Sequence, residues 1–137
     1  MADRIRRTEY WYTHVADTPG QGLRIMRALE EAGVNLLAFS AFPAAGKGAQ
    51  VDLVPEAREP FLKACKGAGL TLTGPKTCFL VDGADRSGAV ASVLARLAEA
   101  KINVTALDAT CAGSGRWGAL FWVKPADVDA AAKALGV

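Results

Sequence analysis

The sequence predicts an α+β fold of two tandem ferredoxin-like βαββαβ units, each with an antiparallel sheet and both helices on one face of it. Three observations predict this fold. The chain of 137 residues matches itself at an offset of 68 residues, without a gap over much of its length. Each copy carries strand-like and helix-like segments in the same order. With 51% hydrophobic and 22% charged residues, the chain has the composition of a folded globular protein.

The repeat rests on positions that are hard to match by chance. The matched pairs are Asp17 with Asp85, Gly20 with Gly88, Leu29 with Leu97, Glu31 with Glu99 and Asn35 with Asn103. Matches between alanines count for less, because alanine is abundant in this chain. Two copies of this length span almost the whole chain. We therefore predict a first repeat over residues 1–70 and a second over residues 71–137.

The first half of the first copy reads as strand, helix and strand. Residues 9–15 are rich in Tyr, Trp, Thr and Val, which favour a strand. Pro19 and Gly20 indicate a turn, after which apolar residues recur at helical spacing over 23–32. The near-continuous apolar run that follows, 35–42, predicts a strand buried on both faces.

The second half of the copy repeats this order as strand, helix and strand. A hairpin loop over 43–48 leads to a strand at 50–54. Pro60 suits the first turn of a short helix over 60–66, and the glycines that follow end it. The alternation of Leu and Thr predicts a last strand over 70–73.

The second copy has the same elements but stops one strand short. Its predicted strands cover 78–81, 103–110 and 117–123, and its helices cover 88–100 and 125–135. At the repeat offset, the N-terminal residues fall on the end of the first copy's last strand. Our hypothesis is that residues 1–7 supply the missing strand of the second copy. The alternative is a disordered N-terminal tail beside a three-stranded second sheet.

Two motifs in each copy resemble those of the ACT domain. Asp-x-Pro-Gly lies between the first strand and the first helix, and Gly-Val-Asn-Leu leads into the second strand. The first copy has them at 17–20 and 33–36, and the second copy departs from them at Ser87 and Lys101. The resemblance covers nearly the whole chain as two tandem copies. It implies a stand-alone regulator similar to those of the glycine-cleavage repressor type, which is non-catalytic, binds an amino acid and needs no cofactor.

The same residues suggest where a ligand would bind. A glycine-containing loop that opens a helix leaves N–H groups free at the positive end of the helix dipole, where a carboxylate fits. An aspartate there can accept a hydrogen bond from an α-ammonium group, and an asparagine can donate and accept. We expect the ligand at the junction of the two copies or of two chains. The predicted ligand-binding residues are Asp17, Thr18, Pro19, Gly20, Gln21, Gly22, Asn35, Leu36, Asp85, Arg86, Ser87, Gly88, Asn103 and Val104. For each of them the alternative role is structural, as a helix cap, a turn or a helix-to-strand corner.

Composition argues against several classes of protein. The formal charge of +2 is too balanced for nucleic-acid binding by bulk electrostatics. No apolar run approaches the length of a membrane helix, and the charged N-terminus does not read as a secretory signal. Three cysteines without CxxC spacing suggest a reducing compartment, small core residues and neither a disulfide framework nor a metal site. We therefore expect a cytoplasmic protein.

Three alternatives to a ligand-binding regulator stay open. The chain can be a protein-interaction module that regulates a biosynthetic enzyme without a ligand of its own. It can be a small ferredoxin-like enzyme that uses its single histidine, His14, as a base. The aromatic residues of 10–12 and 117–122 can stack on RNA bases, although they come from different copies, and a role in the core or an interface fits them better. The apolar runs 36–39 and 120–123 do not alternate, so we expect the second face of each sheet to be covered and the chain to form a homodimer.

Overall fold

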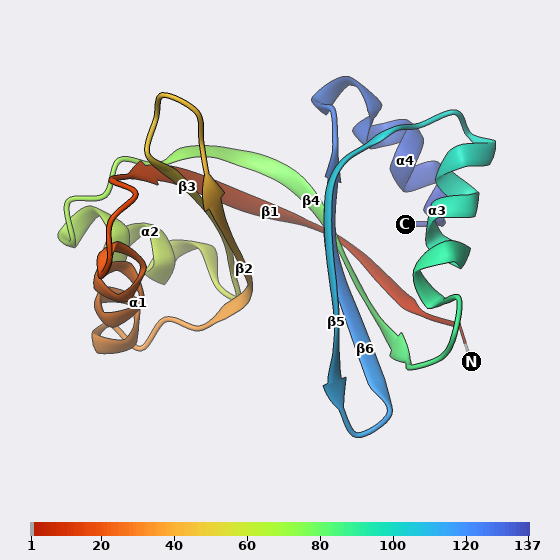
Figure 1. The fold of residues 1–137 in the computed structure, drawn as a ribbon, viewed down its shortest axis with the longest axis horizontal. Coiled ribbons are helices and arrows are strands. Elements are labelled where there is room, and N and C mark those ends of the chain that lie inside the picture. Colours follow the sequence, from red (N-terminus) through yellow and green to blue (C-terminus); the bar gives the residue numbers. More distant parts are fainter. Residues whose placement is uncertain (1) are drawn as a thin grey trace. The chain divides into compact units, whose positions relative to one another are not determined.

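A computed structural model describes residues 2–137 and divides them into two compact units (Figure 1). The first unit comprises residues 9–76. The second unit comprises residues 77–137 together with residues 2–8 from the start of the chain. Two strands of 12 residues each, β1 (Arg4–Val15) and β4 (Thr73–Ala84), contribute residues to both units.

The first unit has the predicted βαββαβ order. After β1 come α1 (Gln21–Glu31), β2 (Leu36–Pro43), β3 (Ala49–Pro55), α2 (Arg58–Gly67) and the start of β4. The strands lie in the order β2, β3, β1, β4, and β3 is antiparallel to both of its neighbours. Trp11 faces Leu53 across the β1–β3 pair and packs on Phe61 of α2, with the ring centroids 5.4 Å apart.

The second unit repeats this order and draws its last strand from the N-terminus. It consists of the end of β4, α3 (Ala89–Glu99), β5 (Val104–Gly113), β6 (Arg116–Val123), a single turn of 3-10 helix η1 (Pro125–Asp127) and α4 (Val128–Leu135). Its strands lie in the order β5, β6, β4, β1. Residues 4–8 of β1 are therefore its fourth strand, and Ile5 packs against its core. Residue 1 lies outside the described residues.

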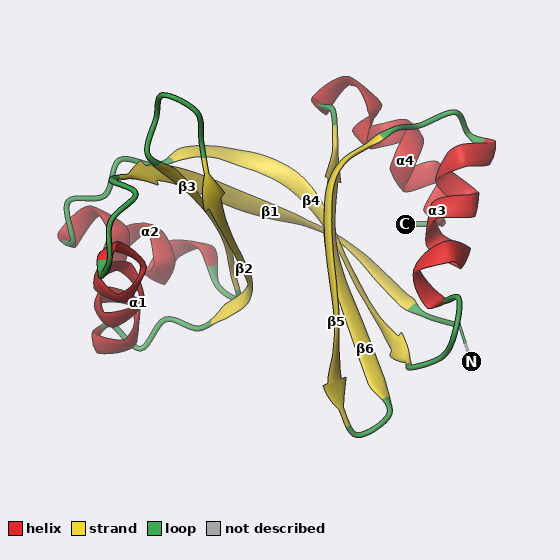
Figure 2. Cartoon of the chain, viewed as in Figure 1, coloured by secondary structure: helices red, strands yellow, loops and turns green. Residues whose placement is uncertain are grey.

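Each unit places its two helices on one face of its sheet, as the sequence predicts (Figure 2). The apolar residues at helical spacing explain this packing, because they put one stripe of each helix against the sheet. In α3 that stripe is Ala89, Val93 and Leu97, all buried. Phe79 and Phe121 stack beneath it with centroids 5.2 Å apart, and both are completely buried.

The predicted boundaries hold to within a few residues except in β1 and β4. Residues 4–8 and the predicted strand at 9–15 form one continuous strand, β1. The sequence suggested separate strands at 70–73 and 78–81, but the structure has one continuous strand. Gly74 makes this possible, because its φ of 142° is a conformation that glycine adopts freely. A Cβ at residue 74 would also lie 2.8 Å from the Trp11 ring, so a glycine at this position lets β4 pass close to the ring.

Two expectations about burial are wrong. The run 36–39 is not buried on both faces, because β2 is an edge strand and Leu37 and Phe39 are 38% and 41% exposed. Cys111 is exposed, whereas Cys65 and Cys78 are core residues as expected. Sequence patterns do not distinguish edge strands from central strands, and the second faces of edge strands are open to water.

Candidate functional site

The loop between the first strand and the first helix of each unit ends on a glycine that caps the helix. Gly20 and Gly88 have φ angles of 93° and 83°, in the left-handed region where a side chain is unfavourable. Each glycine carbonyl accepts the first hydrogen bond of its helix, from the N–H of Arg24 or of Ser92. The first-turn N–H groups have no partner within a helix and point out of its N-terminus as donors, and in α3 the Ala89 N–H donates to the Arg86 carbonyl at 3.3 Å.

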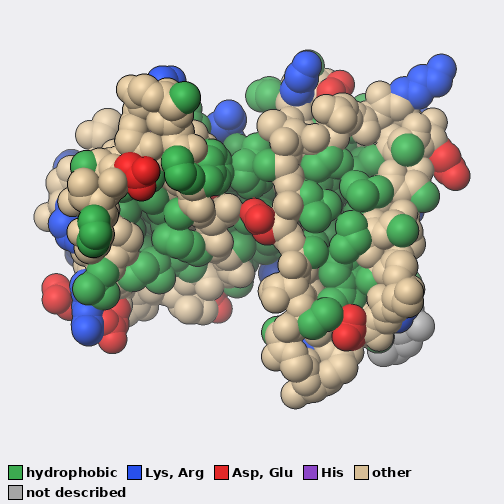
Figure 3. All heavy atoms as spheres, viewed as in Figure 1, with side chains coloured by type: hydrophobic (Ala, Val, Ile, Leu, Met, Phe, Trp, Pro, Cys, Tyr) green, Lys and Arg blue, Asp and Glu red, His purple; other side chains and the backbone are tan. Residues whose placement is uncertain are grey.

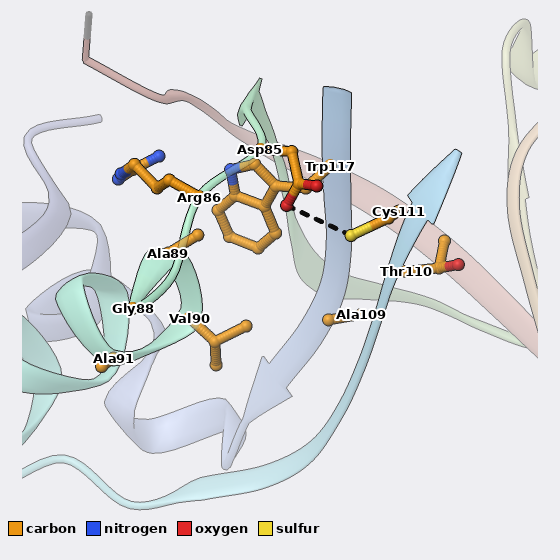
Figure 4. A pocket seen from close by; sticks show the side chains of 10 residues that line it. All are labelled: Asp85, Arg86, Gly88, Ala89, Val90, Ala91, Ala109, Thr110, Cys111 and Trp117. Atoms are coloured by element: carbon orange, nitrogen blue, oxygen red, sulfur yellow. Dashed lines mark hydrogen bonds between the residues drawn. The ribbon is translucent and has the colours of Figure 1, made fainter. Parts of the chain in front are cut away.

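In the second unit this helix terminus opens onto a hollow (Figure 4). The hollow has a volume of about 310 Å³, at the lower end of the range for small-molecule sites. It lies between the N-terminus of α3 and the C-terminal end of β5, with Trp117 of β6 also in its wall. Its lining consists of Asp85, Arg86, Gly88, Ala89, Val90, Ala91, Ala109, Thr110, Cys111 and Trp117.

Asp85 supplies a carboxylate at the mouth of the hollow. Its backbone N–H donates to the Gly115 carbonyl at 2.8 Å, which ties the loop to the β5–β6 turn. Its Oδ1 accepts a hydrogen bond from the Cys111 Sγ at 3.2 Å. That hydrogen bond, with burial and the negative charge of Asp85, raises the pKa of the Cys111 thiol. The thiol therefore stays protonated at neutral pH and is a poor nucleophile.

Arg86 lines the hollow, but its guanidinium is held by an N-terminal residue. Its side chain points away from Val90 and Ala109 in Figure 4. Its two terminal nitrogens donate to the two carboxylate oxygens of Asp3 at 3.0 and 2.9 Å, a bidentate geometry. This pairing keeps the pKa of Asp3 below its usual value, with a further contribution from Trp117. The predicted ligand-binding side chain of Arg86 is thus used to fix the loop.

Asp3 also connects the loop to the wall of the hollow. The Trp117 indole N–H donates to the Asp3 Oδ1 at 3.1 Å. The Asp3 side chain is only 9% exposed, and Gly83 leaves the room it occupies, because a Cβ there would overlap its carboxylate. Sequence analysis missed Asp3, Trp117 and Cys111. The one sequence signal for Asp3 was that residues 1–7 fall on the end of the first copy's last strand at the repeat offset.

The first unit has a corresponding loop with different neighbours. Residues 17–20 are exposed and residues 21 and 22 are half-buried. At the repeat offset, Pro43 stands where the second unit has Cys111, and Ala49 where it has Trp117. Pro43 and Ala49 pair across β2 and β3. The thiol and the indole that line the hollow of the second unit therefore have no counterpart in the first.

The asparagines do not join these loops within a unit. Asn35 and Leu36 follow the C-terminal end of α1, and the Asn35 carbonyl accepts from the Glu56 N–H at 3.0 Å. A helix of 11 residues separates this point from Gly20 by about 16 Å. Asn103 and Val104 stand in the same relation to Gly88 in the second unit. In the second unit β5 runs back along α3, so its far end, at Ala109 and Cys111, reaches the loop of residues 85–88.

Most of the aromatic residues are buried in the cores, and the histidine packs against a tyrosine ring at the surface. Trp11, Trp117 and Phe121 are at most 4% exposed and belong to the cores. Tyr10 and Trp122 are also buried, so these rings do not form an exposed stacking surface for RNA. His14 is exposed, and its ring meets the edge of Tyr12 with a centroid distance of 5.6 Å.

Residues 2–137 contain no cluster of three or more His, Cys, Asp or Glu side chains that could hold a metal ion. No helix in this part of the chain is long and apolar enough to cross a membrane.

Comparison with known proteins identifies the fold. The sequence matches no protein-family model, and no curated protein matches it. Among solved structures, protein BT0572 from Bacteroides thetaiotaomicron has a TM-score of 0.80 at 14% identity, over 96% of this chain and 88% of that one. The regulatory subunit of aspartate kinase from Thermus thermophilus has a TM-score of 0.64 at 13% identity, over 98% and 94%. The structure of aspartokinase alpha and beta subunits also gives 0.64, at 17% identity, over 100% and 99%. The chain therefore shares the fold of the aspartate kinase regulatory subunit, and the predicted ferredoxin-like fold is confirmed.

Proposed function

We propose that this chain is a non-catalytic regulatory protein that binds an amino acid in the hollow of the second unit. The observation that carries the proposal is the hollow itself, where an open helix N-terminus and the Asp85 carboxylate border one small cavity. The shared fold with aspartate kinase regulatory subunits supports a regulatory role. The regulated partner would then be a metabolic enzyme.

The lining has the charges that a zwitterion needs. The Ala89 N–H already donates to the Arg86 carbonyl, and the other N–H groups in the first turn of α3 can donate to a carboxylate at the positive end of the helix dipole. Asp85 keeps lone pairs beyond the one used by the Cys111 thiol, and these can accept from an α-ammonium group. Arg86 adds no free cation because Asp3 neutralises it. Val90 and Ala109 give the ligand side chain an apolar wall, so a small side chain is expected.

The chemistry of the lining supports a binding role rather than catalysis. Nucleophilic catalysis by Cys111 would require a lowered thiol pKa, but the neighbouring Asp85 raises it. His14 lies on β1 in the first unit, and its exposed ring packs on Tyr12. These observations favour ligand binding over the alternative of an enzyme that uses His14.

Thermal unfolding of the purified chain with each of the twenty amino acids tests the proposal. A ligand present at about 100 times its dissociation constant adds about 2.7 kcal/mol to the free energy of unfolding. For a domain of this size, that is a rise in Tm of roughly 10 °C. The expected result is a rise with one or a few small amino acids and none with the others.

A matched pair of variants locates the site. Ala109 lines the hollow, and Ala41 is its counterpart at the repeat offset; both are exposed. Ala109→Glu should abolish the ligand-induced rise in Tm, whereas Ala41→Glu should leave it intact. The reverse result would place the ligand at the predicted loop of residues 17–22. No rise with any amino acid would favour the protein-interaction module instead.

We also propose that two copies associate through the strip between each edge strand and its neighbouring helix. Hydrophobic side chains lie at the surface between β5 and α3 in Figure 3. Leu94 of α3 is 39% exposed, as is Met26 of α1, and Phe39 of β2 is 41% exposed. A second copy would remove these side chains from water and cover the hollow. Light scattering should give the mass of a dimer, and a monomer at micromolar concentration would contradict the proposal.

A further inference from the structure

A groove runs between α1 and α2 on the outer surface of the first unit. Its volume is about 950 Å³. Small side chains form much of it, and a few charged ones border it; the lining is Ala28, Glu31, Ala32, Glu59, Pro60, Lys63, Ala64, Gly67 and Ala68. A Cβ added at Gly67 would meet no atom within 4 Å, so this part of the groove is open space.

The second unit fills the equivalent space with its own side chains. Ala28 of α1 corresponds to Arg96 of α3. The helix ends of α2 and α4 correspond at an offset of 67 residues, because Gly69 donates to the Lys66 carbonyl as Gly136 donates to the Lys133 carbonyl. Ala68 therefore corresponds to Leu135, which is 3% exposed, whereas Ala68 is half-buried and lines the groove.

Arg96 shows what such a groove accepts. Its Nε donates to the Ala134 carbonyl near the end of α4 at 3.2 Å. One of its terminal nitrogens reaches the C-cap of this helix, where it would lie 3.6 Å from a Cβ at Gly136. The side chain therefore spans from α3 to the carbonyl end of α4, where a helix dipole favours a cation.

We infer that the groove of the first unit is a docking site for an arginine side chain presented by a partner protein. The arginine would take the place that Arg96 holds in the second unit. Its guanidinium would reach the carbonyl of Gly67, the counterpart of Ala134, at the end of α2. The inference concerns a different surface from the amino-acid site and stands independently of it.

The charges around the groove fit this occupant. Glu31 ends α1 and Glu59 lies in the first turn of α2, so two carboxylates border the groove against the single ammonium of Lys63. Charged side chains gather around α1 in Figure 3. Complementary charge at the rim steers a cationic partner and sets its orientation. An arginine stem also packs against the alanines, which a smaller cation cannot do.

Titration of the isotope-labelled full chain with N-acetyl-L-arginine N-methylamide, followed by NMR, tests the inference. Both termini of this compound are blocked, so it lacks the charges that the amino-acid site recognises. We expect saturable shifts at the amides of Ala64, Gly67 and Ala68, with a dissociation constant of about a millimolar, as for a small fragment. N-acetyl-L-norleucine N-methylamide, without the guanidinium, should bind at least fivefold more weakly.

Two variants fill the groove from within. Ala28→Arg and Ala68→Leu each restore the residue of the second unit, and each should weaken arginine binding at least tenfold. Ala98→Arg, on an exposed face of α3, is the matched control and should bind like the unaltered chain. Shifts scattered over the surface, or equal binding by all three variants, would overturn the inference. Dissociation of a dimer by both filling variants would also overturn it, since a second copy would then be the occupant.

Discussion

The substitution Gly83→Ala should disrupt the attachment of the N-terminal residues to the ligand loop. A Cβ at Gly83 would lie 2.9 Å from the Asp3 Cγ and overlap its Oδ1. The carboxylate must then move by about the width of an atom, because the backbone of β4 is fixed between two strands. This movement breaks the hydrogen bond that the Trp117 indole donates to Asp3 at 3.1 Å.

The magnitude follows from the burial of Trp117. Trp117 is only 4% exposed, so water cannot easily replace the Asp3 carboxylate as the acceptor of its indole N–H. A buried donor left without a partner costs about 1–3 kcal/mol. For a chain of this length the Tm should fall by roughly 4–10 °C. Thermal and urea unfolding measure this, with Gly118→Ala as control, because its Cβ would meet only the Val81 carbonyl, at 3.4 Å.

A double-mutant cycle identifies the cause. In an Asp3→Ala background the overlap no longer exists, so Gly83→Ala should have little further effect. The coupling energy between the two positions should then be about as large as the effect of Gly83→Ala alone. An unchanged Tm in Gly83→Ala, or the same loss with and without Asp3, would refute the reasoning.

Three further predictions concern acid stability, thiol reactivity and the core. Arg86 lowers the pKa of Asp3, so ionised Asp3 stabilises the fold above its unfolded pKa of about 4. This stability is lost as the pH falls through the lower folded pKa. In urea unfolding from pH 6 to 2.5, the free energy of unfolding should therefore fall less steeply with pH in Asp3→Asn than in the unaltered chain. Alkylation of Cys111 by iodoacetamide at pH 7.5 should be slow, because its hydrogen bond to Asp85 raises the pKa of the thiol. Alkylation should be faster in Asp85→Asn, where the thiol pKa falls. An unchanged rate would contradict the role of the hydrogen bond between Cys111 and Asp85. Phe121→Ala should cost about 3–5 kcal/mol in urea unfolding, because the ring is fully buried, and a loss below 1 kcal/mol would show that the core closes around the gap.

Much of the fold follows from local patterns in the sequence. The spacing of apolar residues in 88–100 specifies α3 and its buried stripe, since the helical period alone decides which side chains share a face. The matching of Asp17 and Gly20 with Asp85 and Gly88 indicates two units of one fold. Pro19 and Gly20 indicate the turn before α1, because glycine adopts the left-handed conformation found there at no steric cost.

The composition of the hollow could not be predicted in this way. The motifs placed Asn103 with Asp85 in one predicted ligand site. In the structure Asn103 lies beyond the C-terminal end of α3, and β5 runs back along the helix, so Cys111 at its far end lines the hollow instead. Asp3 and Trp117 are 114 residues apart, and only the pairing of strands puts them in contact.

The sequence by itself therefore determined the element order and the turns before the helices, which depend on interactions within a few residues. Only the tertiary structure decided which strand is an edge, which side chains line the hollow and that Arg86 is held by Asp3. It also decided that the groove between α1 and α2 stays open while Arg96 spans its counterpart. The physical reason is that burial and charge pairing depend on distances between segments far apart in the chain, which the local pattern of residues does not encode.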